Sequence, residues 1–387
     1  MRRLLSALLL LCAFASASAH ADGLTADTEA RWVPFDLGAG NQIHFTLTLD
    51  GAPVSAILDT GVSTSILSRA YVVRHKLKVQ PAGAADAIGG RIATDVVQAR
   101  ALAMGGLQRS GVALSVATLP ATATGNTPID MLVGRDLTAA YALDIDFDAH
   151  RFRLLPSGRM PFTGASAPLA ISPDRMVYVS EMIMGGARVK PLQVDTGDGA
   201  SVTLSQRAWQ FVKPAAPLET TALAYGLGGP IVMGRAIVPR VVSGTEIATD
   251  VEITIEPQGG FSDSIGMAGR IGLAFLQRYR VLLDPGAGHM ILKPGALAET
   301  PTLRSTSGLL LGTEPGRLRV LHVMRGGPGE AGGWKTGDTI CSVDGVGVDA
   351  GYGGSAAAGW TVGAPGRTVT LGLCDGSVRR LTLQQFY

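Results

Sequence analysis

The chain has 387 residues, of which 46% are hydrophobic and 17% charged, and its formal net charge is +2. This charge leaves no basic excess to bind a phosphate backbone, so the composition argues against a nucleic-acid partner. The length suits two or three domains of ordinary size. The 51 glycines and 21 prolines are spread along the chain. That distribution is typical of many short strands joined by tight turns, so we expect a mostly β protein.

The N-terminus has the order of a secretory signal peptide. A basic start at residues 1–3 is followed by an apolar run over residues 4–17 and by small residues up to Ala21. The alternative is a membrane anchor, but a spanning helix needs about 20 apolar residues and this run is shorter. We therefore expect residues 1–21 to be removed, leaving an exported protein, periplasmic or secreted, without a membrane span.

The cysteines and histidines limit which disulfides and metal sites the chain can form. Removal of residues 1–21 would also remove Cys12 and leave Cys341 and Cys374, in a compartment where disulfides form. The two residues either pair or remain buried thiols, because the strand register that decides this cannot be read from the sequence. The six histidines are scattered singly and no Cys/His cluster has the spacing of metal ligands. We expect neither a metal nor another cofactor.

The most informative feature is an internal repeat with two anchors. The first anchor is a short strand that runs into Asp59-Thr60-Gly61 and recurs before Asp195-Thr196-Gly197. The second is a block around Gly134 that aligns without a gap on a block around Gly272. Gly134 lies 75 positions after Asp59, and Gly272 lies 77 positions after Asp195. One Asp-Thr-Gly is a common turn composition, but two copies in the same context indicate one β-rich lobe present twice.

Two such turns suit peptide hydrolysis without a metal or a covalent intermediate. Carboxyls about 3 Å apart cannot both ionise, so the pair holds one proton and supplies both a base and an acid. The sequence therefore predicts an aspartic endopeptidase with Asp59 and Asp195 as its catalytic residues. Because both copies lie on one chain, we expect a monomer. Glycines that permit sharp turns and threonines that bond across the lobe interface would support the pair: Thr60, Gly61, Thr196 and Gly197.

These turns, together with the blocks Leu132-Val133-Gly134 and Arg270-Ile271-Gly272, resemble the retropepsin-like and pepsin-like aspartic proteases. Arg270 departs from that pattern, since the family has an apolar residue at this position. The resemblance implies two β-barrel lobes related by a pseudo-twofold axis, residues 22–160 and 161–298, with a polypeptide substrate in the cleft between them. It also implies glycine-rich hairpin flaps over the cleft, with tips at Ile88, Gly89 and Gly90 in the first lobe and at Gly228 and Gly229 in the second.

The residue after each Asp-Thr-Gly differs from the Ser or Thr that is usual in pepsin-like enzymes. Val62 resembles the small apolar residue of the retroviral type, whereas Asp198 places a third carboxylate near the pair. Such a carboxylate would raise the proton affinity of the pair or bind a basic group. Our hypothesis is that Asp198 faces the cleft and favours a basic side chain in the substrate.

A separate module is expected after a linker at residues 299–307 that contains Thr, Ser and Pro. Its stretch from Gly337 to Gly345 resembles the PDZ domains of bacterial proteases, so residues 308–387 are expected to form a small α+β PDZ-like domain. The resemblance implies that the module takes a protein C-terminus or partner as an added strand. The alternative is a domain that only packs on the protease body. The loop that binds the carboxylate would be formed by Leu309, Leu310 and Leu311.

Two classes of function follow from the sequence. The first is an endopeptidase that acts on exported or envelope proteins and uses the PDZ-like module for recruitment. The alternative is a non-catalytic peptide-binding adaptor on the same scaffold, against which the retention of both aspartates argues. A serine or cysteine hydrolase lacks a supporting motif, because no Gly-x-Ser-x-Gly turn or Cys/His pairing is present.

Overall fold

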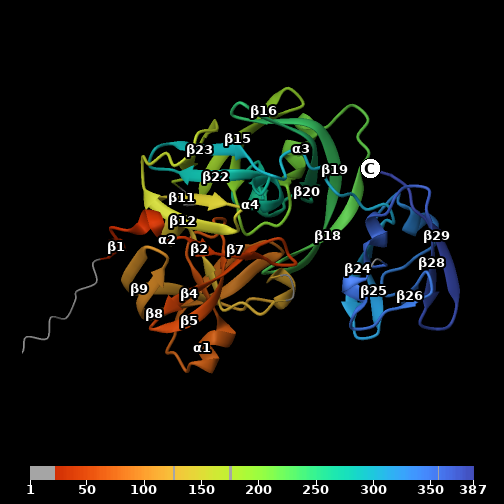
Figure 1. The fold of residues 1–387 in the computed structure, drawn as a ribbon, viewed down its shortest axis with the longest axis horizontal. Coiled ribbons are helices and arrows are strands. Elements are labelled where there is room, and N and C mark those ends of the chain that lie inside the picture. Colours follow the sequence, from red (N-terminus) through yellow and green to blue (C-terminus); the bar gives the residue numbers. More distant parts are fainter. Residues whose placement is uncertain (1–21, 125–126, 174–176, 356) are drawn as a thin grey trace, which may run out of the picture.

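The computed structural model describes residues 22–124, 127–173, 177–355 and 357–387. The predicted signal peptide, residues 1–21, lies outside the described residues. The chain is mostly β, as expected, with two β-rich lobes and a smaller C-terminal module (Figure 1). Within the described part of the chain, no helix is both long enough and apolar enough to cross a membrane.

The first lobe is built on a sheet with the strand order β1-β9-β6-β10-β5-β4-β8-β7, and β3 pairs with β4. Strand β4 shows why these residues form a half-buried sheet: residues 43, 45, 47 and 49 are buried, and each residue between them is more exposed. Ser68 caps the N-terminus of helix α1 (Arg69–Arg74), and its Oγ accepts a hydrogen bond from Tyr71 N. The strands are β1 Gly23–Leu24, β3 Asp36–Leu37, β4 Ile43–Leu49, β5 Ala52–Leu58, β6 Ile66–Ser68, β7 Gln80–Ala87, β8 Gly90–Met104, β9 Leu107–Ala117 and β10 Met131–Val133.

The second lobe repeats the first. Its sheet has the order β14-β15-β16-β21-β17-β20-β19-β18, in which β21 runs parallel to β16 as β10 does to β5. Ser205 caps the N-terminus of helix α3 (Gln206–Val212), as Ser68 caps that of α1. The strands are β14 Ala170–Ile171, β15 Tyr178–Met184, β16 Ala187–Val194, β17 Val202–Leu204, β18 Thr220–Gly226, β19 Gly229–Ser243, β20 Glu246–Ile255 and β21 Gly269–Ile271.

A third sheet, of order β13-β23-β22-β11-β12-β2, joins the two lobes. Its central pair is antiparallel, with Leu143 of one half opposite Leu283 of the other. Asp144 is fully buried in this sheet and accepts hydrogen bonds from Arg153 and Arg280. The strands are β2 Val33–Pro34, β11 Tyr141–Asp146, β12 Arg151–Pro156, β13 Ala165–Pro168, β22 Tyr279–Asp284 and β23 His289–Pro294. The short helices beside the sheets are η1 Thr28–Ala30, η2 Ala121–Thr124, α2 Arg135–Thr138, α4 Phe261–Ser264 and α5 Leu273–Leu276.

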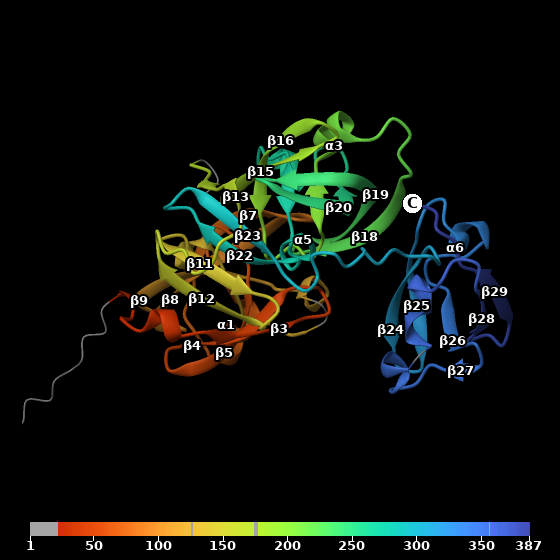
Figure 2. The same cartoon turned by 45° about the horizontal axis from the view of Figure 1, so that its top comes forward.

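The C-terminal module lies to one side of the lobes and has its own hydrophobic core, which includes Trp334 and Trp360 (Figure 2). Its sheet has the order β24-β25-β26-β28-β29, and β27 pairs with β26. Leu309 to Leu311 lie in β24 rather than in a loop, because their backbones pair with β25. The elements are β24 Leu309–Glu314, β25 Arg317–Val323, α6 Pro328–Ala331, β26 Thr339–Val343, β27 Val346–Gly347, η3 Tyr352–Gly354, η4 Ala358–Val362, β28 Thr368–Leu373 and β29 Val378–Thr382.

Two features left open by the sequence concern this module. Cys341 and Cys374 are joined by a disulfide, with their Cα atoms 5.0 Å apart. This pairing arises because β26 and β28 are neighbours in the sheet. The end of the predicted linker belongs structurally to the module, since Thr306 N donates to Thr361 O at 2.9 Å and Ser307 is fully buried.

Candidate active site

The two Asp-Thr-Gly turns follow equivalent strands and are held in the same way. Asp59 comes directly after β5, and its backbone N donates to Val133 O of β10 at 2.9 Å. Asp195 comes directly after β16, and its backbone N donates to Ile271 O of β21 at 2.9 Å. The blocks before Gly134 and Gly272 therefore fix where each turn begins.

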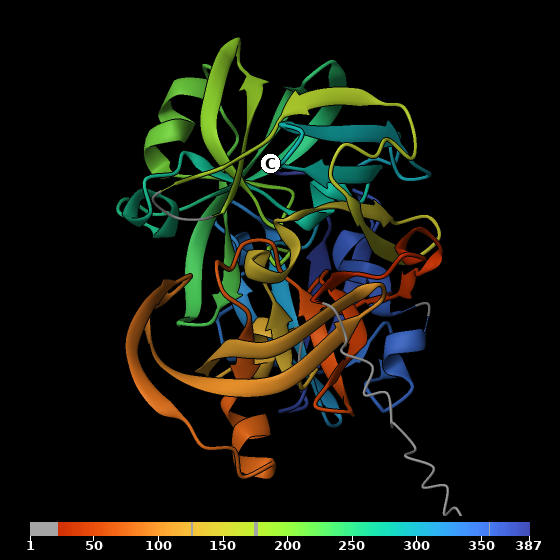
Figure 3. The same ribbon diagram turned by 90° about the vertical axis from the view of Figure 1, so that its left-hand side faces the viewer.

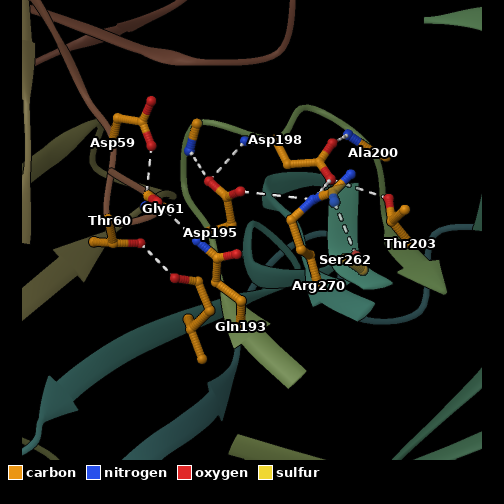
Figure 4. Close-up of polar contacts among 12 residues, drawn as sticks. Asp59, Thr60, Gly61, Gln193, Asp195, Asp198, Ala200, Thr203, Ser262 and Arg270 are labelled. Carbon is orange, nitrogen blue, oxygen red and sulfur yellow. Dashed lines mark hydrogen bonds and ion pairs between the residues drawn. The ribbon is translucent and has the colours of Figure 1, made fainter. Parts of the chain in front are cut away.

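The two carboxylates face each other across the glycines of the turns. A Cβ added to Gly61 would lie 2.3 Å from Asp195 Oδ1, and a Cβ added to Gly197 would lie 2.3 Å from the Cγ of Asp59. No side chain fits at either position, which explains why both are glycine. Each glycine N also donates to Oδ1 of the aspartate in its own turn, at 3.0 Å (Figure 4). The fold thus brings the predicted pair, Asp59 and Asp195, together.

The threonines hydrogen-bond across the interface between the lobes. Thr60 Oγ1 donates to Val194 O at 2.8 Å, and Thr196 Oγ1 donates to Leu58 O at 2.7 Å. Each hydroxyl also accepts from the backbone N of the other threonine at 3.0 Å. Both threonines are fully buried. These four bonds hold the two turns in one register, which is the geometry expected from the sequence.

A cavity of about 450 Å³ lies above the pair. Asp59 and Asp195 both line it, Asp195 is largely buried with 5% of its surface exposed, and most of the other lining side chains are apolar. The residues that contribute from the two hairpins include Ala87, Ile88, Ile92, Tyr225, Gly226 and Leu227. The cavity is therefore closed above by hairpins and below by the two turns.

The tips of the two long hairpins, β7–β8 and β18–β19, meet over this cavity (Figure 3). Gly228 N donates to Ile88 O at 2.9 Å. A Cβ added to Gly228 would lie 2.4 Å from the backbone of Gly89, so the contact requires a glycine. Gly90 and Gly229 both have positive φ, which glycine adopts at little cost. The sequence-predicted flap residues thus lie at two tips that touch each other.

Burial raises the pKa values of both aspartates, and a neighbouring carboxylate raises each of them further. For Asp59, desolvation and then the charge of Asp195 raise the pKa well above its usual range. For Asp195, desolvation and then the charge of Asp198 raise the pKa to about 6, while the Arg270 guanidinium lowers it. The single proton shared by the pair is therefore retained to higher pH than that of a solvent-exposed aspartate.

Asp198 lines the cavity, but its carboxylate is already bonded. Oδ2 accepts from Arg270 Nε and from Thr203 Oγ1, both at 3.0 Å, and Oδ1 accepts from Ala200 N at 3.0 Å (Figure 4). A substrate cation would have to compete with Arg270 for this carboxylate. The contacts therefore favour an internal role for Asp198 over the predicted recognition of a basic side chain.

Two glutamines at the site carried no recognised signal in the sequence. Gln193 Nε2 donates to Gly61 O at 2.7 Å, and Gln42 Nε2 donates to Gly197 O at 2.9 Å. Both side chains line the cavity, and the buried Oε1 atom of each has no hydrogen-bond partner within the described part of the chain. Gln193 could have been noticed because it stands two positions before Asp195, but Gln42 lies outside the repeated blocks.

The comparison with protein families agrees with the class that this geometry indicates. Residues 45–137 match the sequence model of the family described as "Aspartyl protease". No curated protein matches the chain. A matching solved structure is the EIAV protease complexed with the inhibitor HBY-793, with 22% identity, coverage of 24% of this chain and 83% of that chain, and a TM-score of 0.21. The family match includes Asp59 and Gly134 and supports an aspartic protease of the hydrolase class. It ends before the second lobe, so the assignment of Asp195 depends on the internal repeat.

Proposed function

We propose that the chain is an aspartic endopeptidase that cleaves exported or envelope proteins, with Asp59 and Asp195 as its catalytic pair. The observation that carries this proposal is the contact of each turn glycine with the opposite aspartate at the floor of a hairpin-covered cavity. In that position one carboxylate takes a proton from the attacking water, and the other carboxyl gives a proton to the carbonyl oxygen of the peptide. The tetrahedral intermediate then breaks its C–N bond as the leaving nitrogen receives a proton.

The pKa shifts of the pair predict how cleavage depends on pH. The active form has one proton on the pair, so it predominates above the pKa of about 6 of Asp195 and below the pKa of Asp59, which is raised well above its usual range. Below pH 6 the base becomes protonated, and kcat/KM is expected to fall about tenfold for each unit of pH. The measurement is cleavage of an unfolded protein over a pH series, with new termini identified by mass spectrometry. Binding without new termini at every pH would instead support the adaptor alternative.

The proposed role of the C-terminal module is to recruit a substrate or partner protein. In support, the module touches β18, a strand of the second flap hairpin: Thr220 Oγ1 donates to Arg325 O at 2.8 Å, and His322 Nε2 lies 2.9 Å from Thr221 Oγ1. The module is therefore in direct contact with a hairpin that covers the cavity.

Removal of residues 305–387 tests this recruitment. We expect cleavage of a short peptide to continue and cleavage of a full-length protein to slow several-fold, because only the protein would use a second site. The comparison is made at equal concentrations of folded enzyme, judged by circular dichroism. Equal rates before and after truncation on both substrates would contradict recruitment.

A further inference from the structure

Four positions of the repeat have opposite chemistry in the two lobes. Strand register identifies the equivalent residues, since Leu132 of β10 pairs with Ile66 as Arg270 of β21 pairs with Thr203. A further position is the residue that follows each Asp-Thr-Gly. The last position follows Val116 in the first lobe and Ile255 in the second, because Val116 pairs with Leu67 as Ile255 pairs with Leu204. The first lobe has Val62, Ile66, Ala117 and Leu132, and the second has Asp198, Thr203, Glu256 and Arg270.

In the first lobe these positions form an apolar cluster. Ile66, Ala117 and Leu132 are buried and pack together, with Val62 partly buried against them. None of these side chains carries a charge or a hydrogen-bonding group. Asp59, the aspartate of this lobe, therefore has no cation among them.

In the second lobe the same positions surround a buried guanidinium. Arg270 and Glu256 are each only 1% exposed. Arg270 Nε lies 3.0 Å from Asp198 Oδ2 and 3.7 Å from Asp195 Oδ2, and Nη1 donates to Glu256 Oε1 and to Ser262 Oγ. One buried cation thus contacts three carboxylates, and Figure 4 shows two of them, Asp198 and the Asp195 of the catalytic pair.

This difference makes the two catalytic carboxylates unequal. Both are close to each other, but of the two only Asp195 has a cation beside it among the residues that the structure describes. An opposite charge at such a distance favours the ionised form of a carboxyl group. We propose, on the basis of the proteolytic function above, that Arg270 is a positioning residue that keeps Asp195 as the carboxylate base, so that Asp59 carries the shared proton and acts as the acid.

The charged groups around Asp195 are distributed over several elements. Asp59 faces it from the first lobe, Asp198 lies in its own turn, and Arg270 lies on β21. Glu256, at the end of β20, contacts Arg270 rather than Asp195. From the flaps, Asp86 and Tyr225 line the same cavity, and Asp86 has Arg91 at 3.5 Å. Two charges therefore act mainly on the ionisation of Asp195: the guanidinium of Arg270 favours it, and the carboxylate of Asp198 opposes it.

Two sets of substitutions are expected to shift the pH at which Asp195 ionises in opposite directions. Asp198→Asn removes the opposing charge but keeps a hydrogen-bonding side chain of the same size. We expect the acidic limb of the kcat/KM profile to move about one pH unit lower. The double variant Glu256→Gln with Arg270→Gln removes the cation together with its most buried partner and leaves Asp198 charged. We expect the same limb to move about one pH unit higher.

A matched control is available in the sheet that joins the lobes. Asp144 is also fully buried and bonded by two arginines, and its contacts lie outside the catalytic cavity. Asp144→Asn is expected to lower thermal stability without moving either limb of the pH profile. A general loss of packing would therefore be distinguished from a change in the charge around Asp195.

Carboxyl ¹³C NMR titration gives a second measurement that does not depend on cleavage. In the unmodified protein the Asp195 signal should titrate at lower pH than the Asp59 signal, with assignments from the Asp59→Asn and Asp195→Asn variants. Asp198→Asn should lower the titration midpoint of Asp195, and the double variant should raise it. An Asp195 midpoint that stays the same or falls in the double variant would overturn the role of Arg270, and a midpoint that does not fall in Asp198→Asn would contradict the opposing effect of Asp198. If the unmodified protein cleaves nothing, the proposed function fails, and the titration still decides which carboxyl holds the proton.

Discussion

Asp59→Asn and Asp195→Asn are each expected to lower kcat for peptide cleavage on the order of 10³-fold. The reason is that an amide can neither take a proton from water nor supply one to the carbonyl oxygen, and the remaining carboxyl cannot fill both roles. Both the base and the acid are needed for cleavage, so the loss should be similar for both variants. The measurement is single-turnover cleavage of a peptide that the unmodified protein hydrolyses.

Folding of these variants is checked separately. Asn has nearly the same volume as Asp, and its neutrality removes the repulsion between the buried carboxylates. The thermal midpoint should therefore stay the same or rise in both variants. Asp130→Asn is a matched control, because Asp130 makes an ion pair with the more exposed Arg74 away from the cavity and its loss should leave the rate unchanged. Retention of the rate within twofold by either catalytic variant would contradict the assignment.

The internal repeat made much of the site predictable from the sequence. Asp59 and Asp195 could be assigned because each stands at a fixed distance from a second repeated block, and equivalent strands carry them to the same interface. The departure of Arg270 from the apolar pattern was visible as well. Its consequence was not, since Glu256 lies outside both blocks and meets Arg270 only through the pairing of β17 with β20 and β21.

Other contacts depend on register or on distant segments, which a single sequence does not specify. The disulfide between Cys341 and Cys374 follows from the pairing of β26 with β28. Gln42 reaches Gly197 O from the other lobe, across 155 positions of sequence. The run Leu309 to Leu311 was predicted to be a loop, but an apolar run suits a strand equally well, and backbone pairing with β25 decides the outcome.

Arg270→Leu is expected to lower the free energy of unfolding by about 3–5 kcal/mol. Leucine is the residue that occupies the equivalent position in the first lobe, at residue 132. In the second lobe, however, the substitution leaves Glu256 and Asp198 buried without their cation. Removal of one partner from a buried ionic cluster is costly because the remaining charges are desolvated and unpaired. The measurement is urea unfolding at neutral pH.

The first lobe supplies the variant that separates this charge effect from a packing effect. Its four residues can be transferred together by the substitutions Asp198→Val, Thr203→Ile, Glu256→Ala and Arg270→Leu. The quadruple variant keeps the same leucine but buries no unpaired carboxylate from the cluster, and replacement of a buried ionic cluster by apolar residues is often neutral or stabilising. It should therefore recover at least about 2 kcal/mol of the stability lost by Arg270→Leu alone. Equal stability of the single and quadruple variants would show that the buried charges near Asp195 do not depend on Arg270.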